Sequence, residues 1–353
     1  MKKRIVFTGG GTAGHVTPNL ALIAAFQQLG WKIDYIGSRN GIEERMIIAV
    51  GVPFHAITCG KLRRYLTLKN LFEPFRILWG IIQSLYILKR LKPNVVFSKG
   101  GFVAFPVVVA AWVWRVPILA HESDLSPGLA NRLSLPFINK MCLTFAPSKL
   151  PDKRFAVTGT PIREALFTGS REKGLGLCGF QADKPCLLVI GGGQGAGILN
   201  DVIREGLTEI TKKYQVIHLC GRDKEDANLR SRSGYYQLGY ADEELPDLLA
   251  AADVVLSRAG ANSLYELLAL NKLHILVPLS PKVSRGDQVE NANFFEKKGI
   301  SVVIDNDALT VDALMQAIEE VNARKEEILT KMAALNIRSA TQQIGALIQD
   351  SAI

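Results

Sequence analysis

The chain has 353 residues, 48% of them hydrophobic and 21% charged, with 31 glycines, 15 prolines and five cysteines. This composition excludes a disordered, collagen-like or low-complexity protein. At roughly 100–200 residues per domain, the length predicts two domains. The cysteines are scattered and form no CxxC pair, so we expect neither a zinc knuckle nor a disulfide framework, and a reducing compartment fits best.

Charge is distributed unevenly along the chain. Residues 1–163 hold 22 Lys and Arg against 7 Asp and Glu, whereas residues 164–353 are net negative. A basic half indicates an anionic partner such as nucleic acid, a phosphorylated substrate or a lipid surface, although a lysine-rich solvated face would give the same count. The most apolar stretch, residues 101–114, is too short for a spanning helix of about twenty residues, and we expect a buried strand and helix there.

The first predicted elements are a buried strand over residues 4–8, a glycine loop over 9–14, a helix over about 18–29 and a strand over 32–37. The unpaired N–H groups of such a loop and the positive end of the following helix suit a phosphate, although the glycines could serve only a tight turn. This order of elements is typical of a nucleotide-binding α/β unit.

The first glycine loop also matches the dinucleotide fingerprint GxGxxG. Asp34 lies where an NAD enzyme would hold its ribose, but a lone match of this kind is weak. His15, at the start of the helix, would project into the phosphate space. It is either a capping residue or, because the helix dipole favours its neutral form, a base.

The same series recurs in the second half, with a strand over 186–190, a glycine loop over 191–197, a helix to about Lys212 and a strand over 215–220. A further pair of segments match each other as an apolar strand followed by Ser, a basic residue and small residues: 95–101 and 254–260. The duplication predicts two domains of similar plan.

Alternating strands and helices predict parallel sheets with right-handed crossovers. We therefore expect two doubly wound domains facing each other across a cleft, with a boundary near residues 159–177. In open parallel sheets ligands bind beyond the carboxyl ends of the strands, where all four small-residue loops would lie. A last helix is expected over about 324–348, and the sequence does not decide which domain it joins.

Two polar side chains stand out in the second half. Glu266 follows the predicted helix start near Ala261 by just over one turn, where a carboxylate can accept both hydroxyls of a ribose. Gln288 opens another helix after the strand over 274–278, and an amide suits the neutral hydroxyls of a sugar. No His, Cys and carboxylate spacing predicts a metal site.

Taken together, these segments resemble the MurG family of bacterial peptidoglycan glycosyltransferases. The similarity runs almost end to end, through both glycine loops and through residues 98–102, 121–122, 127–131, 159–163, 257–266 and 288–292. It implies the GT-B fold, two Rossmann-like domains with parallel sheets. Residues 1–163 would be the acceptor- and membrane-binding domain, with the C-terminal helix 324–353 as a possible addition, and residues 164–323 the UDP-GlcNAc-binding domain.

The resemblance implies an inverting transferase. The family moves N-acetylglucosamine (GlcNAc) from UDP-GlcNAc to the 4-hydroxyl of N-acetylmuramic acid (MurNAc) in undecaprenyl-diphospho-MurNAc-pentapeptide, converting lipid I to lipid II in peptidoglycan synthesis. The implied partners are UDP-GlcNAc, lipid I, an anionic membrane surface and other cell-wall synthesis proteins, without nucleic acid, cofactor or metal. The implied location is peripheral, on the cytoplasmic face of the inner membrane.

The resemblance also implies which residues bind substrate. Glu266 would hold the ribose, Gln288 would contact the GlcNAc hydroxyls, and Arg163 would contact the diphosphate. The full set is Thr12, Ala13, Gly14, His15, Arg163, Gly193, Gln194, Ala261, Asn262, Ser263, Leu264, Glu266 and Gln288.

Two positions depart from the family pattern. Gly193 stands where members often have Ser, so it offers a phosphate only its N–H. Ser123 and Asp124 stand where many members carry Gln-Asn, which places an acid at that point. For the base that takes the acceptor proton, His15 is our first candidate and Asp124 the second.

Two other functions are compatible with parts of this sequence. One is an NAD-dependent oxidoreductase that uses the first glycine loop. The other is a UDP-GlcNAc 2-epimerase, which has the same fold without an acceptor and should not need a basic, aromatic first half.

One helical face predicts contact with a membrane. Apolar residues at spacings of 3, 4 and 3 lie within a stretch, 61–90, that is rich in Lys and Arg and holds the single acid Glu73. Such a stripe could also be core, but a basic rim around an aromatic face is typical of an interfacial helix. The residues expected at this surface are Arg63, Arg64, Phe72, Phe75, Arg76, Trp79 and Ile82.

Overall fold

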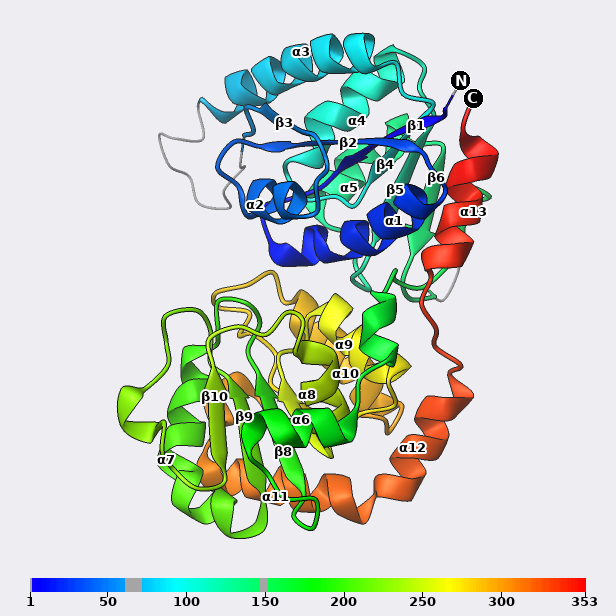
Figure 1. Ribbon diagram of the computed structural model, residues 1–353. Coiled ribbons are helices and arrows are strands. Elements are labelled where there is room, and N and C mark those ends of the chain that lie inside the picture. Colours follow the sequence, from blue (N-terminus) through cyan, green and yellow to red (C-terminus); the bar gives the residue numbers. More distant parts are fainter. Residues whose placement is uncertain (1, 61–71, 147–151) are drawn as a thin grey trace. The chain divides into compact units, whose positions relative to one another are not determined.

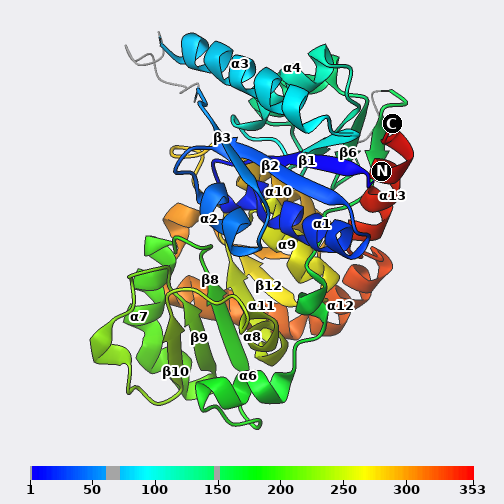
Figure 2. The ribbon, with the colours of Figure 1, turned by 45° about the horizontal axis from the view of Figure 1, so that its top comes forward.

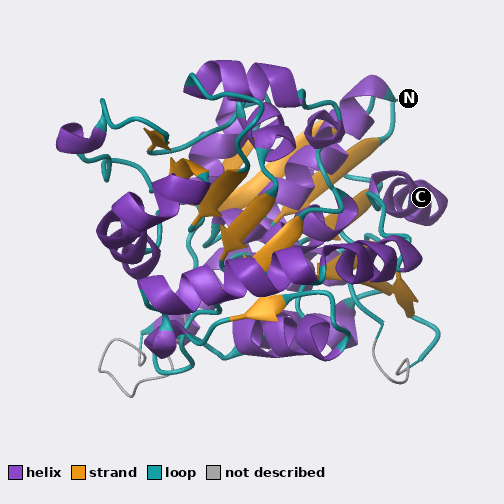
Figure 3. Cartoon of the chain, turned by 90° about the horizontal axis from the view of Figure 1, so that it is seen from below, coloured by secondary structure: helices purple, strands orange, loops and turns teal. Residues whose placement is uncertain are grey.

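The computed structural model describes residues 2–60, 72–146 and 152–353. The chain divides into two compact units, one of residues 1–163 with 339–353 and the other of residues 164–338 (Figure 1). Each unit has its own sheet, and Figure 3 shows the strands with helices packed around them. The predicted internal duplication is therefore present in the structure.

Within the described residues, the first unit is built on a seven-stranded parallel sheet of order β3-β2-β1-β4-β5-β6-β7. Its strands are β1 (Arg4–Thr8), β2 (Lys32–Ser38), β3 (Phe54–Ile57), β4 (Val95–Ser98), β5 (Ile118–Glu122), β6 (Lys140–Leu143) and β7 (Phe155–Val157). Its helices are α1 (Thr17–Gln28), α2 (Ile42–Ala49), α3 (Glu73–Leu91), α4 (Ala104–Val113), α5 (Leu129–Ser134) and α13 (Thr341–Ser351). Residues 101–114 form a turn and α4, without the expected strand.

The central strands β1, β4 and β5 are buried on both faces, and their successive side chains point to opposite sides of the sheet. Ile5 and Phe7 of β1 join a core cluster with α1, α2 and α13, whereas Val6 joins the cluster under α3 and α4. Figure 1 shows α3 and α4 on one side of these strands and α1 with α13 on the other. This explains why β1 reads as a continuous apolar run rather than an alternating one.

The prediction of a single C-terminal helix over about 324–348 is wrong. The chain forms α12 (Lys325–Ala334) in the second unit and α13 in the first, and Asn336 between them has φ +47°, which ends the helix. Ser339 fixes the return to the first unit, because its Oγ accepts from the N–H of Ile162 at 3.0 Å and donates to the carbonyl of the same residue at 3.1 Å.

Within the described residues, the second unit holds a six-stranded parallel sheet of order β10-β9-β8-β11-β12-β13, whose β8, β9 and β10 lie side by side in Figure 2. Its strands are β8 (Cys186–Ile190), β9 (Gln215–Leu219), β10 (Tyr235–Leu238), β11 (Val254–Ser257), β12 (Leu273–Leu276) and β13 (Val302–Val303). Its helices are α6 (Arg171–Cys178), α7 (Gly197–Lys213), α8 (Leu245–Ala251), α9 (Ala261–Ala269), α10 (Asp287–Lys297), α11 (Val311–Ala323) and α12.

Both sheets reverse their strand order at the same point in the plan. In the first sheet the reversal lies between β1 and β4, where Thr8 pairs with Ser98. In the second it lies between β8 and β11, where Ile190 pairs with Ser257. The four predicted small-residue loops follow these four strands, so each pair of loops meets at a switch point, which is where open α/β sheets bind ligands.

Candidate functional site

Glycines fix the two loops at the switch point of the first sheet. Gly11 has φ +86°, and a Cβ there would lie 2.4 Å from the ring of Phe102. Gly101 has φ +80°, and a Cβ there would lie 2.3 Å from the carbonyl oxygen of Gly10. A side chain at either position would be both strained and blocked, so the backbone of each loop lies directly against the other loop.

His15 lies at this contact. It ends a short 3-10 turn, Ala13–His15, and its N–H donates to the carbonyl of Thr12 at 3.1 Å. A Cβ on Gly101 would lie 3.0 Å from its Cδ2 atom. The structure thus brings the half-buried imidazole of the first loop against the second loop, directly before α1.

A buried acid that sequence reasoning missed supports the first loop. Glu43, in the first turn of α2, is fully buried and accepts the N–H groups of Gly11 at 3.2 Å and Ser38 at 3.0 Å, together with the Ser38 hydroxyl. Its carboxylate holds Gly11 from behind, 32 residues further along the chain. The sequence offered no signal for it beyond an acid at a helix start.

The loop after β5 is organised by another buried acid. Glu122 accepts the N–H groups of Asp124 at 3.1 Å and Gly128 at 2.9 Å, and the amide of Asn131 at 2.9 Å. These bonds fold residues 122–128 over the carboxyl end of the strand and leave Asp124 half-buried there. The second candidate base therefore lies on the same edge as the glycine loops.

Lys99 lies under that loop. It directly follows β4, is 1% exposed and donates to the Ser123 hydroxyl. Burial lowers the pKa of Lys99 to about 8, while the carboxylates of Glu122 and Asp124 act in the opposite direction. The sequence showed the basic residue but not that it would be buried.

His121 is a neutral neighbour of this charge. It is fully buried, and burial together with the nearby Lys99 charge keeps its pKa well below the ordinary value. Its Nε2 donates to the carbonyl of Gly159 at 2.9 Å, which leaves Nδ1 as the acceptor nitrogen. Among the described residues this Nδ1 atom is buried without a hydrogen-bond partner.

The switch point of the second sheet carries the other glycine loop. Gly195 has φ +68°, and a Cβ there would lie 1.9 Å from the carbonyl oxygen of Cys220, so only glycine fits. Gly193 is exposed, has no positive φ, and a Cβ there would come no nearer than 3.6 Å to the Tyr240 ring. The neighbouring Gln194 is exposed as well.

Helix α9 presents a polar face at the same edge. Asn262, Ser263 and Glu266 are half-buried and share one side of the helix, whereas the side chain of Leu264 is fully buried and leaves only its backbone for a ligand. The helix has Gly260 as N-cap and no acid in its first turn, so its positive end is not neutralised locally.

Helix α10 is tied to the start of α9. Gln288 Oε1 accepts the N–H of Leu279 at 2.9 Å, and its Nε2 is 4.0 Å from where a Cβ on Gly260 would lie. Asn291 donates from Nδ2 to the carbonyl of Ala259 at 3.2 Å. Within the second unit, Gln288 therefore lies beside Gly260 and the start of α9 at Ala261.

Arg258, which directly follows β11, has a structural task. Its Nη1 donates to the carbonyl of Val277 at 3.0 Å and to Asn306 Oδ1 at 2.7 Å, and burial lowers its pKa. The guanidinium thus holds the segment after β12 beside the loop after β11. Arg163, which the family resemblance assigns to the diphosphate, is half-buried and is the last residue before the chain enters the second unit.

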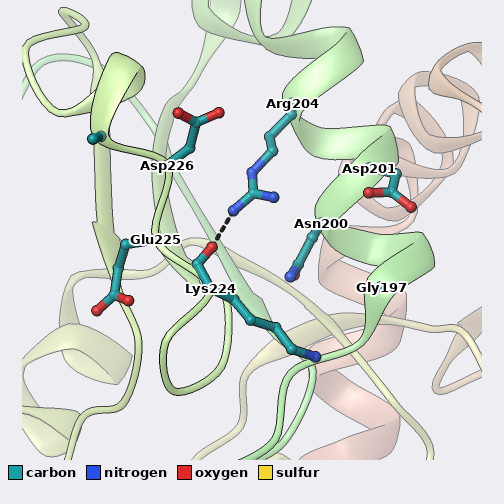
Figure 4. Close-up of a pocket in the computed structure, with 8 residues that line it drawn as sticks. Gly197, Asn200, Asp201, Arg204, Lys224, Glu225 and Asp226 are labelled. Atoms are coloured by element: carbon teal, nitrogen blue, oxygen red, sulfur yellow. Dashed lines mark hydrogen bonds between the residues drawn. The ribbon is translucent and has the colours of Figure 1, made fainter.

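A polar hollow of about 440 Å³ adjoins the second glycine loop (Figure 4). It lies between the start of α7 and the loop after β9, where Arg204 donates to the carbonyl of Lys224. Its lining is Gly197, Asn200, Asp201, Arg204, Lys224, Glu225, Asp226 and Ala227. Because both signs of charge face it, it has no clear preference for an anion.

Asp34 does not lie where an NAD enzyme holds its ribose. It pairs with Val6 in the middle of β2, away from the carboxyl edge. Its carboxylate is bonded to Arg4 Nη1 at 2.9 Å and to His55 Nε2 at 2.8 Å. The fingerprint match in the first loop therefore lacks its acidic partner, and the oxidoreductase alternative is not favoured.

The outer face of α3 is exposed, so the interpretation of its apolar stripe as core is wrong. Phe72, Phe75, Trp79 and Ile82 are 63%, 69%, 54% and 46% exposed. Arg76, beside them, is exposed and pairs with the buried Glu73 at 3.5 Å. The predicted Arg63 and Arg64 lie outside the described residues.

The exposed apolar surface extends beyond the predicted stripe. Trp112 and Trp114, at the end of α4, are 53% and 43% exposed. The indole of Trp114 donates to the carbonyl of Leu85 in α3 at 3.0 Å, and Lys89 lies 5.8 Å from its ring centre. Among the described residues, no helix is long and apolar enough to cross a bilayer.

Family models match both units. The glycosyltransferase family 28 N-terminal domain matches residues 5–143, and the family 28 C-terminal domain matches residues 186–345. The UDP-N-acetylglucosamine–N-acetylmuramyl-(pentapeptide) pyrophosphoryl-undecaprenol N-acetylglucosamine transferase of Legionella pneumophila (strain Paris) is 59% identical, over 100% of this chain and 98% of its own. The protein of the same name from Clostridium perfringens (strain SM101) is 49% identical, over 100% and 99%.

Solved structures agree with these matches. The crystal structure of Acinetobacter baumannii MurG superposes with a TM-score of 0.78 at 26% identity, covering 99% of this chain and 100% of its own. The glycotransferase of kitacinnamycin superposes at 0.77 and 16% identity, which shows the fold alone. The predicted GT-B class, two Rossmann-like domains with parallel sheets, is confirmed. The chain therefore belongs to glycosyltransferase family 28 and, within it, to the UDP-N-acetylglucosamine–N-acetylmuramyl-(pentapeptide) pyrophosphoryl-undecaprenol N-acetylglucosamine transferases.

Proposed function

We propose that this protein is an inverting transferase that moves GlcNAc from UDP-GlcNAc to the 4-hydroxyl of MurNAc in lipid I, forming lipid II. The observation that carries the proposal is the full-length identity of 59% to a relative of that name. The local chemistry supports it, because both switch points present glycine loops and helix starts suited to phosphate groups.

The donor is assigned to the second unit. The N-terminus of α9, which has no acid in its first turn, favours a diphosphate, and Glu266, one turn further on, accepts the two ribose hydroxyls. Gln288 has its Oε1 committed to Leu279, so its Nε2 donates to a GlcNAc hydroxyl. Gly193 and Gln194 contribute backbone N–H groups from the glycine loop.

The acceptor is assigned to the first unit, whose edge carries His15 and Asp124. The base, His15 first and Asp124 second, takes the proton of the 4-hydroxyl as its oxygen attacks the anomeric carbon. The bond from that carbon to the UDP oxygen breaks, and UDP leaves with the electron pair. Arg163, the residues 12–15 and the α9 start stabilise the departing charge.

A direct assay tests the reaction. Labelled UDP-GlcNAc and a short-chain lipid I analogue should give a disaccharide product with inverted anomeric configuration. Label that moves to the C2 epimer of the donor without acceptor would indicate the 2-epimerase alternative instead. Oxidation of NADH, followed at about 340 nm, would indicate an oxidoreductase.

We assign membrane docking to the outer face of α3 and the end of α4. An acceptor carried on a polyprenyl chain lies in the bilayer, whereas the UDP-sugar is dissolved in the cytoplasm, so the protein binds peripherally at the cytoplasmic face of the inner membrane. Exposed Phe75 and Trp79 insert among lipids, and each nearby basic residue adds about 1 kcal/mol toward an anionic surface, screened by salt.

Vesicle sedimentation tests this docking. Phe75→Ser with Trp79→Ser should release the protein from anionic vesicles while activity on a water-soluble acceptor persists. Phe167→Ser, which changes an exposed aromatic residue in the second unit, is the matched control and should bind as wild type. Equal binding of wild type to neutral and anionic vesicles, or to neither, would contradict the assignment.

A further inference from the structure

A buried ammonium group lies beneath the acceptor edge of the first unit, and no step of the reaction described above uses it. Lys99 is 1% exposed, and its Nζ donates to the hydroxyl of Ser123. The carboxylates of Glu122, at the end of β5, and of Asp124, in the loop after it, favour the charged form of Lys99. Lys99 therefore couples the end of β4 to the loop that presents Asp124.

The second unit has a basic residue at the equivalent position, directly after its own central strand. Arg258 directly follows β11, the equivalent of β4, and bonds to the carbonyls of Val277 and Pro278, just after β12, the equivalent of β5. In both units the basic residue after the central strand holds the loop after the neighbouring strand. The geometry of Lys99 is thus a recurrent feature of this architecture and not an accident of one loop.

Stability alone does not explain a lysine at position 99. Moving an ammonium ion out of water is costly, and one hydroxyl and two carboxylates compensate only part of that cost, as the lowered pKa of Lys99 shows. A methionine of similar length would fill the same space without a charge. The position therefore carries a cost that a role in function would account for.

We propose that Lys99 is a positioning residue for the transfer reaction: through Ser123 and its own charge, it fixes the loop 122–128 and holds the Asp124 carboxylate at the edge where the acceptor binds. The inference rests on the proposed function. Lys99 does not touch substrate, because it is enclosed beneath the loop, and it acts through the placement of Asp124.

Three variants and one control separate placement from general damage. Lys99→Met removes the charge at similar volume, Lys99→Arg keeps a charge, and Ser123→Ala removes the contact. Lys32→Met, at an exposed lysine that begins β2, is the matched control. The measurements are kcat, KM for UDP-GlcNAc, and hydrogen exchange of the Asp124 and Gly128 amides, which Glu122 holds in the substrate-free protein.

We expect Lys99→Met to lower kcat about 10- to 100-fold, because a misplaced group loses orientation. The KM for UDP-GlcNAc should stay within about twofold, because the donor is assigned to the other unit. Lys99→Arg should recover most of the turnover. Lys99→Met and Ser123→Ala should both speed exchange at the Asp124 amide about tenfold, since local opening becomes easier. Lys32→Met should match wild type throughout.

Each outcome decides the inference. An unchanged kcat in Lys99→Met overturns the inference. It is also overturned if Lys99→Arg loses as much kcat as Lys99→Met and the KM for UDP-GlcNAc rises as well. If Lys99→Met does not fold, Ser123→Ala is judged by the same criteria. If the wild-type protein transfers no GlcNAc, the proposed function fails. Amide exchange then still decides whether Lys99 holds the loop 122–128. Unchanged exchange in both Lys99→Met and Ser123→Ala overturns the inference.

Discussion

The two units share one plan but solve the same local problem with different chemistry. After the central strand, the first unit places Lys99 and the second places Arg258, each of which reaches the segment after the next strand. The guanidinium of Arg258 donates to backbone carbonyls and to a side-chain amide oxygen, and it stays charged, so it holds this segment in place at any ordinary pH. Lys99 is a point charge among carboxylates, with a pKa of about 8. The difference indicates that one edge is built for rigidity and the other for polar chemistry.

The glycine loops differ in the same sense. The first is closed on both sides, by the Phe102 ring and by the buried Glu43. The second has an open position at Gly193, where an added Cβ would meet only ordinary contact. We therefore expect changes in the first unit to alter turnover and changes in the second to alter donor binding, and the variants below test that division.

The largest expected effect is at the first edge. His15→Ala should lower kcat by about 10²–10⁴-fold, because the acceptor hydroxyl loses its base, while KM for UDP-GlcNAc changes little. Steady-state kinetics with a lipid I analogue measures it. If activity survives in His15→Ala but collapses in Asp124→Asn, the base is Asp124.

The matching change at the second edge should act on binding. Glu266→Ala should raise KM for UDP-GlcNAc, because two ribose hydroxyls lose a charged acceptor, a loss on the order of 2–4 kcal/mol. Calorimetric titration with UDP gives the same loss without catalysis. An unchanged KM with intact folding would remove Glu266 from the ribose.

The two basic residues should respond oppositely to neutralisation. Arg258→Met leaves buried carbonyls unpaired and should cost about 2–3 kcal/mol of unfolding free energy. Lys99→Met removes a buried charge and should raise stability at pH 7 by up to about 3 kcal/mol. Urea unfolding gives the free energy of unfolding of both variants. Tryptophan fluorescence follows the first unit, which contains Lys99 and all four tryptophans.

The Lys99 effect has a defined pH dependence. Its pKa is about 8 in the folded protein and 10.5 when unperturbed, so the unfolded chain binds more protons between these values. Wild-type stability should therefore rise relative to Lys99→Met from about pH 8 to about pH 10.5. If Lys99→Met lowered the unfolding free energy at pH 7 as much as Arg258→Met, both residues would stabilise the fold through their hydrogen bonds.

The smallest effect is expected at the open position of the second loop. Gly193→Ser should fold normally and lower KM for UDP-GlcNAc about two- to fivefold, because a hydroxyl adds one hydrogen bond to phosphate. Gly195→Ser, two residues on, should be destabilised, since its Cβ would lie 1.9 Å from the Cys220 carbonyl oxygen. Equal KM values in wild type and Gly193→Ser would place the phosphates elsewhere.

The sequence by itself determined the positions of the central strands and the loops that follow them. The predicted strand over 186–190 and the predicted helix starts near Ala261 and Gln288 agree with β8, α9 and α10. These signals are local, because a buried parallel strand needs a continuous apolar run and the next helix needs small residues at its start. The duplicated plan and the edge that carries the candidate site followed from them.

Only the tertiary structure decided which residues support those loops and which surfaces stay open. Glu43 and Gly11, or Lys99 and Ser123, are far apart in the chain, and sheet order alone brings them into contact. The stripe on α3 has the same periodicity whether it is core or surface, so its exposure depended on what packs against it. Local pattern sets the elements, whereas long-range contacts set burial, and burial is what makes Lys99 a buried charge and leaves Trp79 exposed.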